Sequence, residues 1–225
     1  MAQPEPSHSY TIDQEQRPVA IGPMRLQALL GVPDHPCGVV IFAHGSGSGR
    51  LSPRNQRVAR ALRKVGLATL LLDLLTPSED LDRANVFDIP LLASRLRLAT
   101  DWIAENPDLA ALPVGYFGAS TGAGAALVAA AEDQRIAAVV SRGGRPDLAG
   151  EALEHVVAPT LLLVGSLDGP VIDLNRLARG RIGGACELVI IQGASHLFEE
   201  PGTLEEVVDH AARWFLNRFA TQGRH

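Results

Sequence analysis

Short apolar runs alternate with helical patterns along most of the chain. Apolar runs of strand length occupy 38–45, 67–75, 114–120, 136–144, 160–168 and 186–193. Apolar residues recur at helical spacing after Ser52-Pro53 and in 91–104, 121–132 and 204–219. This alternation predicts βαβ units, and therefore an α/β fold with a mainly parallel sheet and helices on both faces.

Two segments depart from the alternation. Residues 19–33 predict a pair of strands joined by a turn at Gly22-Pro23, because glycine and proline together interrupt an apolar pattern. Residues 76–88 are polar and irregular and predict a loop. We expect 76–90 to be the only segment available as a lid, so the fold should have little or no cap domain.

The length of 225 residues is that of one α/β domain, and we expect a single domain over 1–225 with loose ends at about 1–8 and 221–225. The formal net charge of −5 excludes the electrostatic footprint of a nucleic-acid-binding protein. Two cysteines predict reduced thiols rather than a disulfide framework. No signal peptide or membrane-length apolar run stands out, which predicts a cytoplasmic protein without membrane association.

The stretch YFGASTGAG (116–124) joins a predicted strand to a predicted helix. Within it, Gly118-Ala119-Ser120-Thr121-Gly122 fits the G-x-S-x-G pattern of a nucleophile elbow, a strained turn that exposes a serine at the end of a strand. The alternative is a turn in which small residues only allow the helix and strand to pack closely. The strand before and the helix after favour Ser120 as a nucleophile.

A serine nucleophile requires a base and a carboxylate that orients the base. Of seven histidines, His44 and His196 lie in loops directly after strands, and His196 follows the last strand. Asp168 ends the strand that comes between those of Ser120 and His196. The alternatives are a backbone-bonded loop histidine and an aspartate that caps a helix. Asp73 and Asp147 are rival acids, with Asp147 the stronger because it follows Ser120 in the chain.

The sequence HGSGSGR (44–50) follows the 38–45 strand. We assign the oxyanion N–H groups to Ser46 in this loop and to Thr121 after the nucleophile. A phosphate-binding loop is the alternative, but the glycine spacing matches neither G-x-x-x-x-G-K-[ST] nor G-x-G-x-x-G. Because neither H-E-x-x-H nor C-x-x-C occurs, we expect no metal, and the chemistry needs no cofactor.

Two arginines, Arg142 and Arg145, follow the 136–141 run. A guanidinium matches a carboxylate with two hydrogen bonds, so these residues are candidate substrate-binding groups for an anionic ester. The alternative is a structural pair with a helix carboxylate such as Glu151 or Glu154.

The motifs HGSGSGR, GASTG, VGSLD and GASHLFEEPG occur in the order Ser, Asp, His. In these motifs the chain resembles the α/β-hydrolase fold and, within it, the dienelactone-hydrolase-like group, from about the 38–45 strand to the final helix. SRGGRPDLA (141–149) also resembles hydrolase domains fused to phosphoribosyltransferases. Dienelactone hydrolase uses a cysteine nucleophile, whereas this chain has Ser120.

Together these observations predict a serine hydrolase that cleaves a small ester or lactone with Ser120, His196 and Asp168. The alternative is a non-catalytic binding or partner domain of the same fold, associated with a phosphoribosyltransferase.

Overall fold

The computed structural model describes residues 16–222. Residues 1–15 and 223–225 lie outside it, so the expectation of loose ends at 1–8 and 221–225 falls almost entirely outside the described residues.

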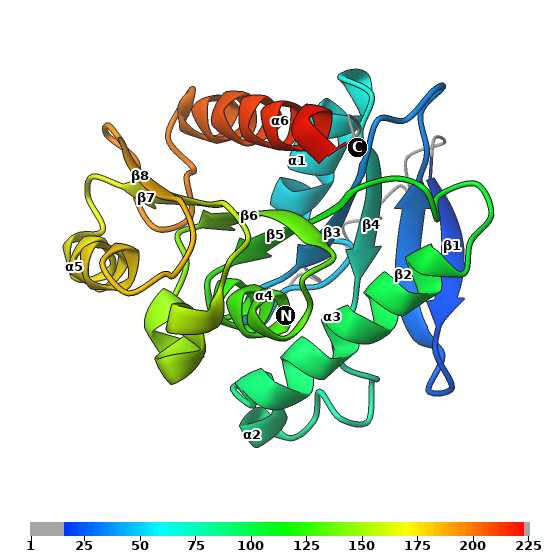
Figure 1. Ribbon diagram of the computed structural model, residues 1–225. Coiled ribbons are helices and arrows are strands. Elements are labelled where there is room, and N and C mark those ends of the chain that lie inside the picture. Colours follow the sequence, from blue (N-terminus) through cyan, green and yellow to red (C-terminus); the bar gives the residue numbers. More distant parts are fainter. Residues whose placement is uncertain (1–15, 223–225) are drawn as a thin grey trace, which may run out of the picture.

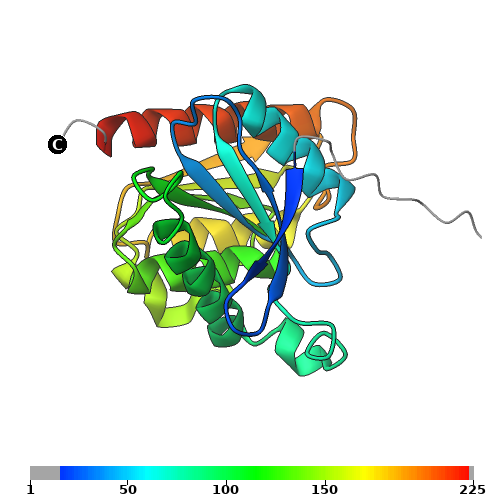
Figure 2. The ribbon, with the colours of Figure 1, turned by 90° about the vertical axis from the view of Figure 1, so that its right-hand side faces the viewer.

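Eight strands form one sheet in the order β1-β2-β4-β3-β5-β6-β7-β8. The strands are β1 (Gln16–Ile21), β2 (Leu26–Gly31), β3 (Val39–Ala43), β4 (Ala68–Leu72), β5 (Val114–Ala119), β6 (Ile136–Arg142), β7 (Thr160–Gly165) and β8 (Cys186–Ile191). The β1–β2 hairpin is antiparallel and joins the edge of β4, whereas the pairs from β4 to β8 are parallel. Figure 2 shows this hairpin from the side.

Helices cover both faces of the sheet (Figure 1). They are α1 (Pro53–Lys64), α2 (Arg83–Val86), α3 (Ile89–Ala104), α4 (Thr121–Glu132), the 3-10 helix η1 (Pro146–His155), α5 (Gly169–Arg179) and α6 (Thr203–Gln222). Helices α1 and α6 pack together on one face, and α3 and α4 pack on the other. The α/β class is therefore confirmed.

The core is built mainly from aliphatic side chains and alanine. Helix α4 buries nine of its residues, five of them alanine or glycine in its first six positions, which lets it lie close to the sheet. Tyr116 of β5 is fully buried, and its hydroxyl lies 2.7 Å from Thr100 Oγ1 of α3. Burial raises the pKa of that phenol.

The expectation of a loop over 76–88 is wrong in one turn. Residues 83–86 form the short helix α2, because the Asp82 side chain accepts a hydrogen bond from the Ala84 N–H at 2.9 Å. A single turn is too short to produce a helical period, so only the capping residue signals it. In the described part of the chain, no helix is long and apolar enough to cross a membrane.

Candidate active site

Ser120 lies at the sharp turn between β5 and α4. Its backbone has φ 50° and ψ −122°, a conformation that side chains rarely adopt. The residue stands at the N-cap position of α4, but its side chain makes no capping hydrogen bond. The hydroxyl is therefore not used to satisfy the helix, as an ordinary N-cap serine would be.

Gly122 shows why the elbow needs a glycine two residues after Ser120. A Cβ atom at this position would lie 2.2 Å from the Ala43 carbonyl oxygen and 2.4 Å from that of His44. The start of α4 thus packs directly against the end of β3. This close approach brings the loop that follows β3 beside Ser120.

Asp168 and His196 come together at the same edge of the sheet, after β7 and β8. The Nδ1 atom of His196 donates a hydrogen bond to Asp168 Oδ2 at 2.6 Å. Asp168 occupies the N-cap position of α5, yet its side chain makes no capping hydrogen bond there. Its carboxylate is directed to the imidazole instead, which decides against the alternative of a helix-capping aspartate.

Both rival aspartates are engaged by arginines. Asp147 accepts two hydrogen bonds from Arg145, at 2.8 and 2.7 Å. Asp73 accepts from the Arg50 backbone N–H at 2.6 Å and also forms an ion pair with the Arg50 guanidinium. Each rival aspartate is paired with an arginine, whereas Asp168 is hydrogen-bonded to His196.

The second loop histidine, His44, is bound to the backbone through both ring nitrogens. Its Nε2 accepts from the Leu74 N–H at 3.1 Å, which leaves Nδ1 to donate to the Gly45 carbonyl at 3.0 Å. These bonds hold the loop after β3 against the loop after β4. His44 therefore has a structural role in this arrangement.

The two predicted oxyanion residues, Ser46 and Thr121, are in contact. The Ser46 N–H donates to Thr121 Oγ1 at 3.0 Å. Thr121 is the first residue of α4, where backbone N–H groups have no partner within the helix. The N-terminal end of α4 also favours negative charge.

Arg142 and Arg145 have different environments. Arg145 donates the two hydrogen bonds to Asp147 described above, and these bonds raise the pKa of Arg145. Arg142 is only 8% exposed, its Nε and Nη1 atoms have no hydrogen-bond partner, and desolvation lowers its pKa to about 10 with a further contribution from Arg54. The side chain points to the same face as Val140, which packs in the cluster that includes α1 and α6.

Glu200 is a supporting residue that the motif analysis did not single out. Its Oε2 accepts from the Ser195 N–H at 3.0 Å, and this bond lowers the pKa of the carboxyl. The bond ties down the loop directly before His196. The sequence GASHLFEEPG contains Glu200, but the pattern does not predict which of its two glutamates accepts the hydrogen bond from Ser195. Among residues 16–222, no cluster of three or more potential metal-ligating side chains occurs.

Several proteins are similar to this chain, although no protein-family model matches it. Two Mycobacterium tuberculosis proteins, from strains CDC 1551 and H37Rv, are each 59% identical over 212 residues, or 94% of this chain and 48% of theirs. They are provisionally named phosphoribosyl transferases, and the chain spans about half of their length.

Solved structures extend the comparison. Est1E from Butyrivibrio proteoclasticus is 18% identical, the match covers 92% of this chain and 100% of Est1E, and the two superpose with a TM-score of 0.75. At that identity the likeness concerns the fold alone. The dienelactone hydrolase from Anabaena variabilis is 55% identical, with 91% of this chain and 99% of that chain covered and a TM-score of 0.86. This chain therefore belongs to the dienelactone hydrolase family, within the α/β-hydrolase fold.

Proposed function

We propose that the chain is a serine hydrolase that cleaves a small ester or lactone through an acyl-enzyme. The observation that carries this proposal is the 2.6 Å hydrogen bond between His196 and Asp168, at the edge of the sheet where Ser120 occupies its strained turn. A capping serine, a capping aspartate and a surface histidine would not need this arrangement.

In the proposed mechanism, Ser120 Oγ attacks the carbonyl carbon while His196 Nε2 takes the hydroxyl proton. Asp168 holds the proton on Nδ1, so that Nε2 is the basic nitrogen. The C–O bond then breaks, and His196 returns the proton to the leaving alkoxide. Water repeats the sequence on the acyl-enzyme and releases the acid and free Ser120.

Negative charge develops on the carbonyl oxygen during both attacks. We assign its stabilisation to the N–H groups of Thr121 and Ser46. The Ser46 N–H donates to Thr121 Oγ1 in the free chain, so the substrate oxygen has to replace that hydroxyl. This exchange requires Thr121 to change its χ1 rotamer, because rotation about its C–O bond alone leaves Oγ1 beside the Ser46 N–H.

The anionic-substrate hypothesis for Arg142 and Arg145 stays a prediction. The two hydrogen bonds from Arg145 to Asp147 favour a structural role for Arg145, although the partner is Asp147 rather than Glu151 or Glu154. Arg142→Ala and Arg145→Ala should raise KM for an acidic ester and barely change it for a neutral ester if the guanidinium binds the substrate. Equal effects on both esters would assign the arginines to the scaffold.

The test of the mechanism combines active-site labelling with kinetics. A fluorophosphonate probe should label the wild-type chain and leave Ser120→Ala unlabelled. With p-nitrophenyl acetate, Ser120→Ala and His196→Ala should each lower kcat by about 10³-fold or more, and the double variant should be little worse than either. An unlabelled wild-type chain, or losses that multiply, would contradict the proposal.

A second candidate concerns partners rather than chemistry. The mycobacterial relatives, twice as long and provisionally named phosphoribosyl transferases, favour an association with a phosphoribosyltransferase domain. We expect the chain to co-purify with the part of such a relative that it does not match. If this association replaced catalysis, the fluorophosphonate probe would not label Ser120.

A further inference from the structure

The turn after β6, formed by residues 142–145, is hydrogen-bonded to the backbone of the proposed nucleophile. Strand β6 lies between β5 and β7, so its carboxyl end lies beside Ser120 (Figure 1). The Ser120 N–H donates to the Arg142 carbonyl at 3.3 Å, and the Arg145 N–H donates to the Ser120 carbonyl at 3.0 Å. Both ends of the turn therefore hold the backbone of Ser120.

The same turn is also hydrogen-bonded to the elements that hold the proposed acid. The Gly143 N–H donates to the Leu163 carbonyl of β7 at 2.8 Å. Asn175 of α5 is fully buried, and its Nδ2 donates to the Gly144 carbonyl at 3.0 Å. Asp168 follows β7 and stands at the N-cap position of α5. The turn after β6 is thus fixed both to the nucleophile and to the two elements that flank the acid.

Gly143 is the point at which the loop that carries His196 lies on this turn. Its φ is +50°, and a Cβ atom there would lie 3.1 Å from the His196 carbonyl oxygen, 3.3 Å from Phe198 Cε2 and 3.5 Å from His196 Nδ1. His196 Nδ1 is the atom that donates to Asp168. The space that a side chain would need at Gly143 is therefore taken by the backbone and imidazole of the proposed base.

The neighbouring glycine, Gly144, has a different environment. A Cβ atom at Gly144 would lie 1.9 Å from Ser141 Oγ and 2.6 Å from Ala123 Cβ, and both of these residues are buried. Gly144 is therefore required by the packing of β6 against α4. At Gly143, in contrast, the three atoms nearest to a Cβ all belong to the loop of the proposed base. The contact at Gly143 thus concerns the site rather than the core.

We propose that Gly143 is a positioning residue that sets how far the His196 imidazole lies from Ser120. The imidazole lies on a turn that is itself hydrogen-bonded to the Ser120 backbone, so the thickness of the turn at Gly143 fixes the separation of base and nucleophile. The proposal rests on the proposed hydrolase function. An alanine at 143 would have to displace the loop of His196 by a few tenths of an ångström. A misplacement of about 1 Å can cost on the order of 10²-fold in rate, so this smaller displacement should still be measurable.

The test measures hydrolysis of p-nitrophenyl acetate by two alanine variants. Gly143→Ala should lower kcat by at least about fivefold and leave KM within about twofold of the wild type. The matched control is Gly150→Ala. Gly150 also has a positive φ, of 56°, but no atom lies within 4 Å of the position of its Cβ. The control therefore introduces backbone strain without the contact, and it should lose stability in urea but keep the wild-type kcat. Equal kcat values for the two variants would overturn the proposal.

The His196→Ala background separates positioning from a general effect on the fold. A residue that acts through the imidazole has nothing to position once the imidazole is removed. Gly143→Ala should therefore leave the residual kcat of His196→Ala unchanged. A further loss of the same size as in the wild-type background would mean that Gly143 acts on the fold, and would overturn the proposal.

Asn175→Ala keeps the proposal testable if Gly143→Ala does not fold. This variant leaves Gly143 in place and removes the amide that holds the Gly144 carbonyl. It should lower kcat in the wild-type background and have no effect in the His196→Ala background, whereas a wild-type kcat would overturn the proposal. The wild type separates the two failures: if it cleaves p-nitrophenyl acetate and is labelled by a fluorophosphonate, a negative result removes only the positioning role, and if it does neither, the hydrolase function falls as well.

Discussion

Replacing Ser120 by glycine should stabilise the fold while it removes the proposed nucleophile. Ser120 has a positive φ of 50° with ψ −122°, which costs a side chain on the order of 1–3 kcal/mol. Glycine adopts this conformation without a Cβ clash. Glycine also gains freedom in the unfolded chain, which offsets roughly 0.5–1 kcal/mol. The expected net gain in the free energy of unfolding is therefore about 0–2.5 kcal/mol.

The matched control is Ser120→Ala, which loses the same hydroxyl but keeps the Cβ atom and the strain. Because the Ser120 side chain makes no capping bond, alanine should stay within about 0.5 kcal/mol of the wild type. Urea unfolding with an unchanged m-value would measure both variants. In a chain of this size the glycine variant should melt up to roughly 10 °C higher.

The outcome distinguishes a strained nucleophile from an ordinary turn. Both variants should be unlabelled by a fluorophosphonate, so the difference in stability between them isolates the backbone. If Ser120→Gly is less stable than Ser120→Ala by the full offset of about 0.5–1 kcal/mol, the turn stores no strain and the elbow interpretation of the backbone is wrong. If glycine alone is more stable, strain is held at the residue proposed for catalysis, as expected where function opposes stability.

Three further predictions concern buried and bonded charges. Asp168→Asn should lower kcat for p-nitrophenyl acetate by more than about 10²-fold and Asp147→Asn only slightly, and the reverse order would move the acid to Asp147. Arg142→Met should leave the free energy of unfolding unchanged or raise it by about 1–3 kcal/mol in urea titrations, because a buried unpaired charge is removed; a loss of stability would mean that Arg142 has a compensating anion. Glu79→Gln should destabilise by on the order of 1 kcal/mol at pH 7. The bonds from Thr76 and Arg95 lower the pKa of Glu79. The stability difference between wild type and Glu79→Gln is therefore present above the ordinary pKa of 4.5 and should disappear as the pH falls further. A stability difference that stays constant in urea titrations from pH 7 to 3 would contradict this prediction.

Much of the fold follows from the hydrophobic pattern. The predicted helix 121–132 matches α4, and the strand expected at 114–120 ends one residue earlier in the structure. Ser52 caps α1 as the Ser-Pro signal predicts, with its side chain accepting from the Asn55 N–H. These features depend on residues within one turn or one strand of each other, which is why the sequence alone predicts them.

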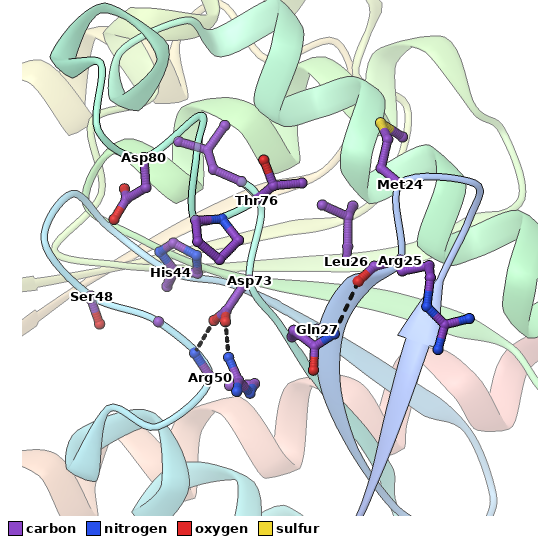
Figure 3. A pocket seen from close by; sticks show the side chains of 13 residues that line it. Met24, Arg25, Leu26, Gln27, His44, Ser48, Arg50, Asp73, Thr76 and Asp80 are labelled. Carbon is purple, nitrogen blue, oxygen red and sulfur yellow. Dashed lines mark hydrogen bonds and ion pairs between the residues drawn. The ribbon is translucent and has the colours of Figure 1, made fainter.

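Side-chain partners, and contacts between distant segments, were not predictable in the same way. Arg145 and Asp147 are two residues apart, but whether a guanidinium folds back or faces the pocket depends on its rotamer and neighbours. A cavity of about 510 Å³ lies between the β1–β2 turn and the loops after β3 and β4 (Figure 3), and no local pattern encodes it because these three segments are separate in the chain. The absence of a partner for the Arg142 Nε and Nη1 atoms depends on α1 and α6, which cover that face of the sheet.

The glycines of the motifs allow close contacts between segments that are distant in the chain. Gly122 belongs to the serine motif, and its missing Cβ leaves room for the Ala43 carbonyl at the end of β3. Gly165 belongs to the motif of Asp168, and a Cβ there would lie 2.3 Å from the Ala194 carbonyl, two residues before His196. One glycine thus brings the oxyanion loop to the nucleophile, and the other brings the histidine loop to the acid. Because both contacts are backbone against backbone, they hold the proposed catalytic groups in place without relying on flexible side chains.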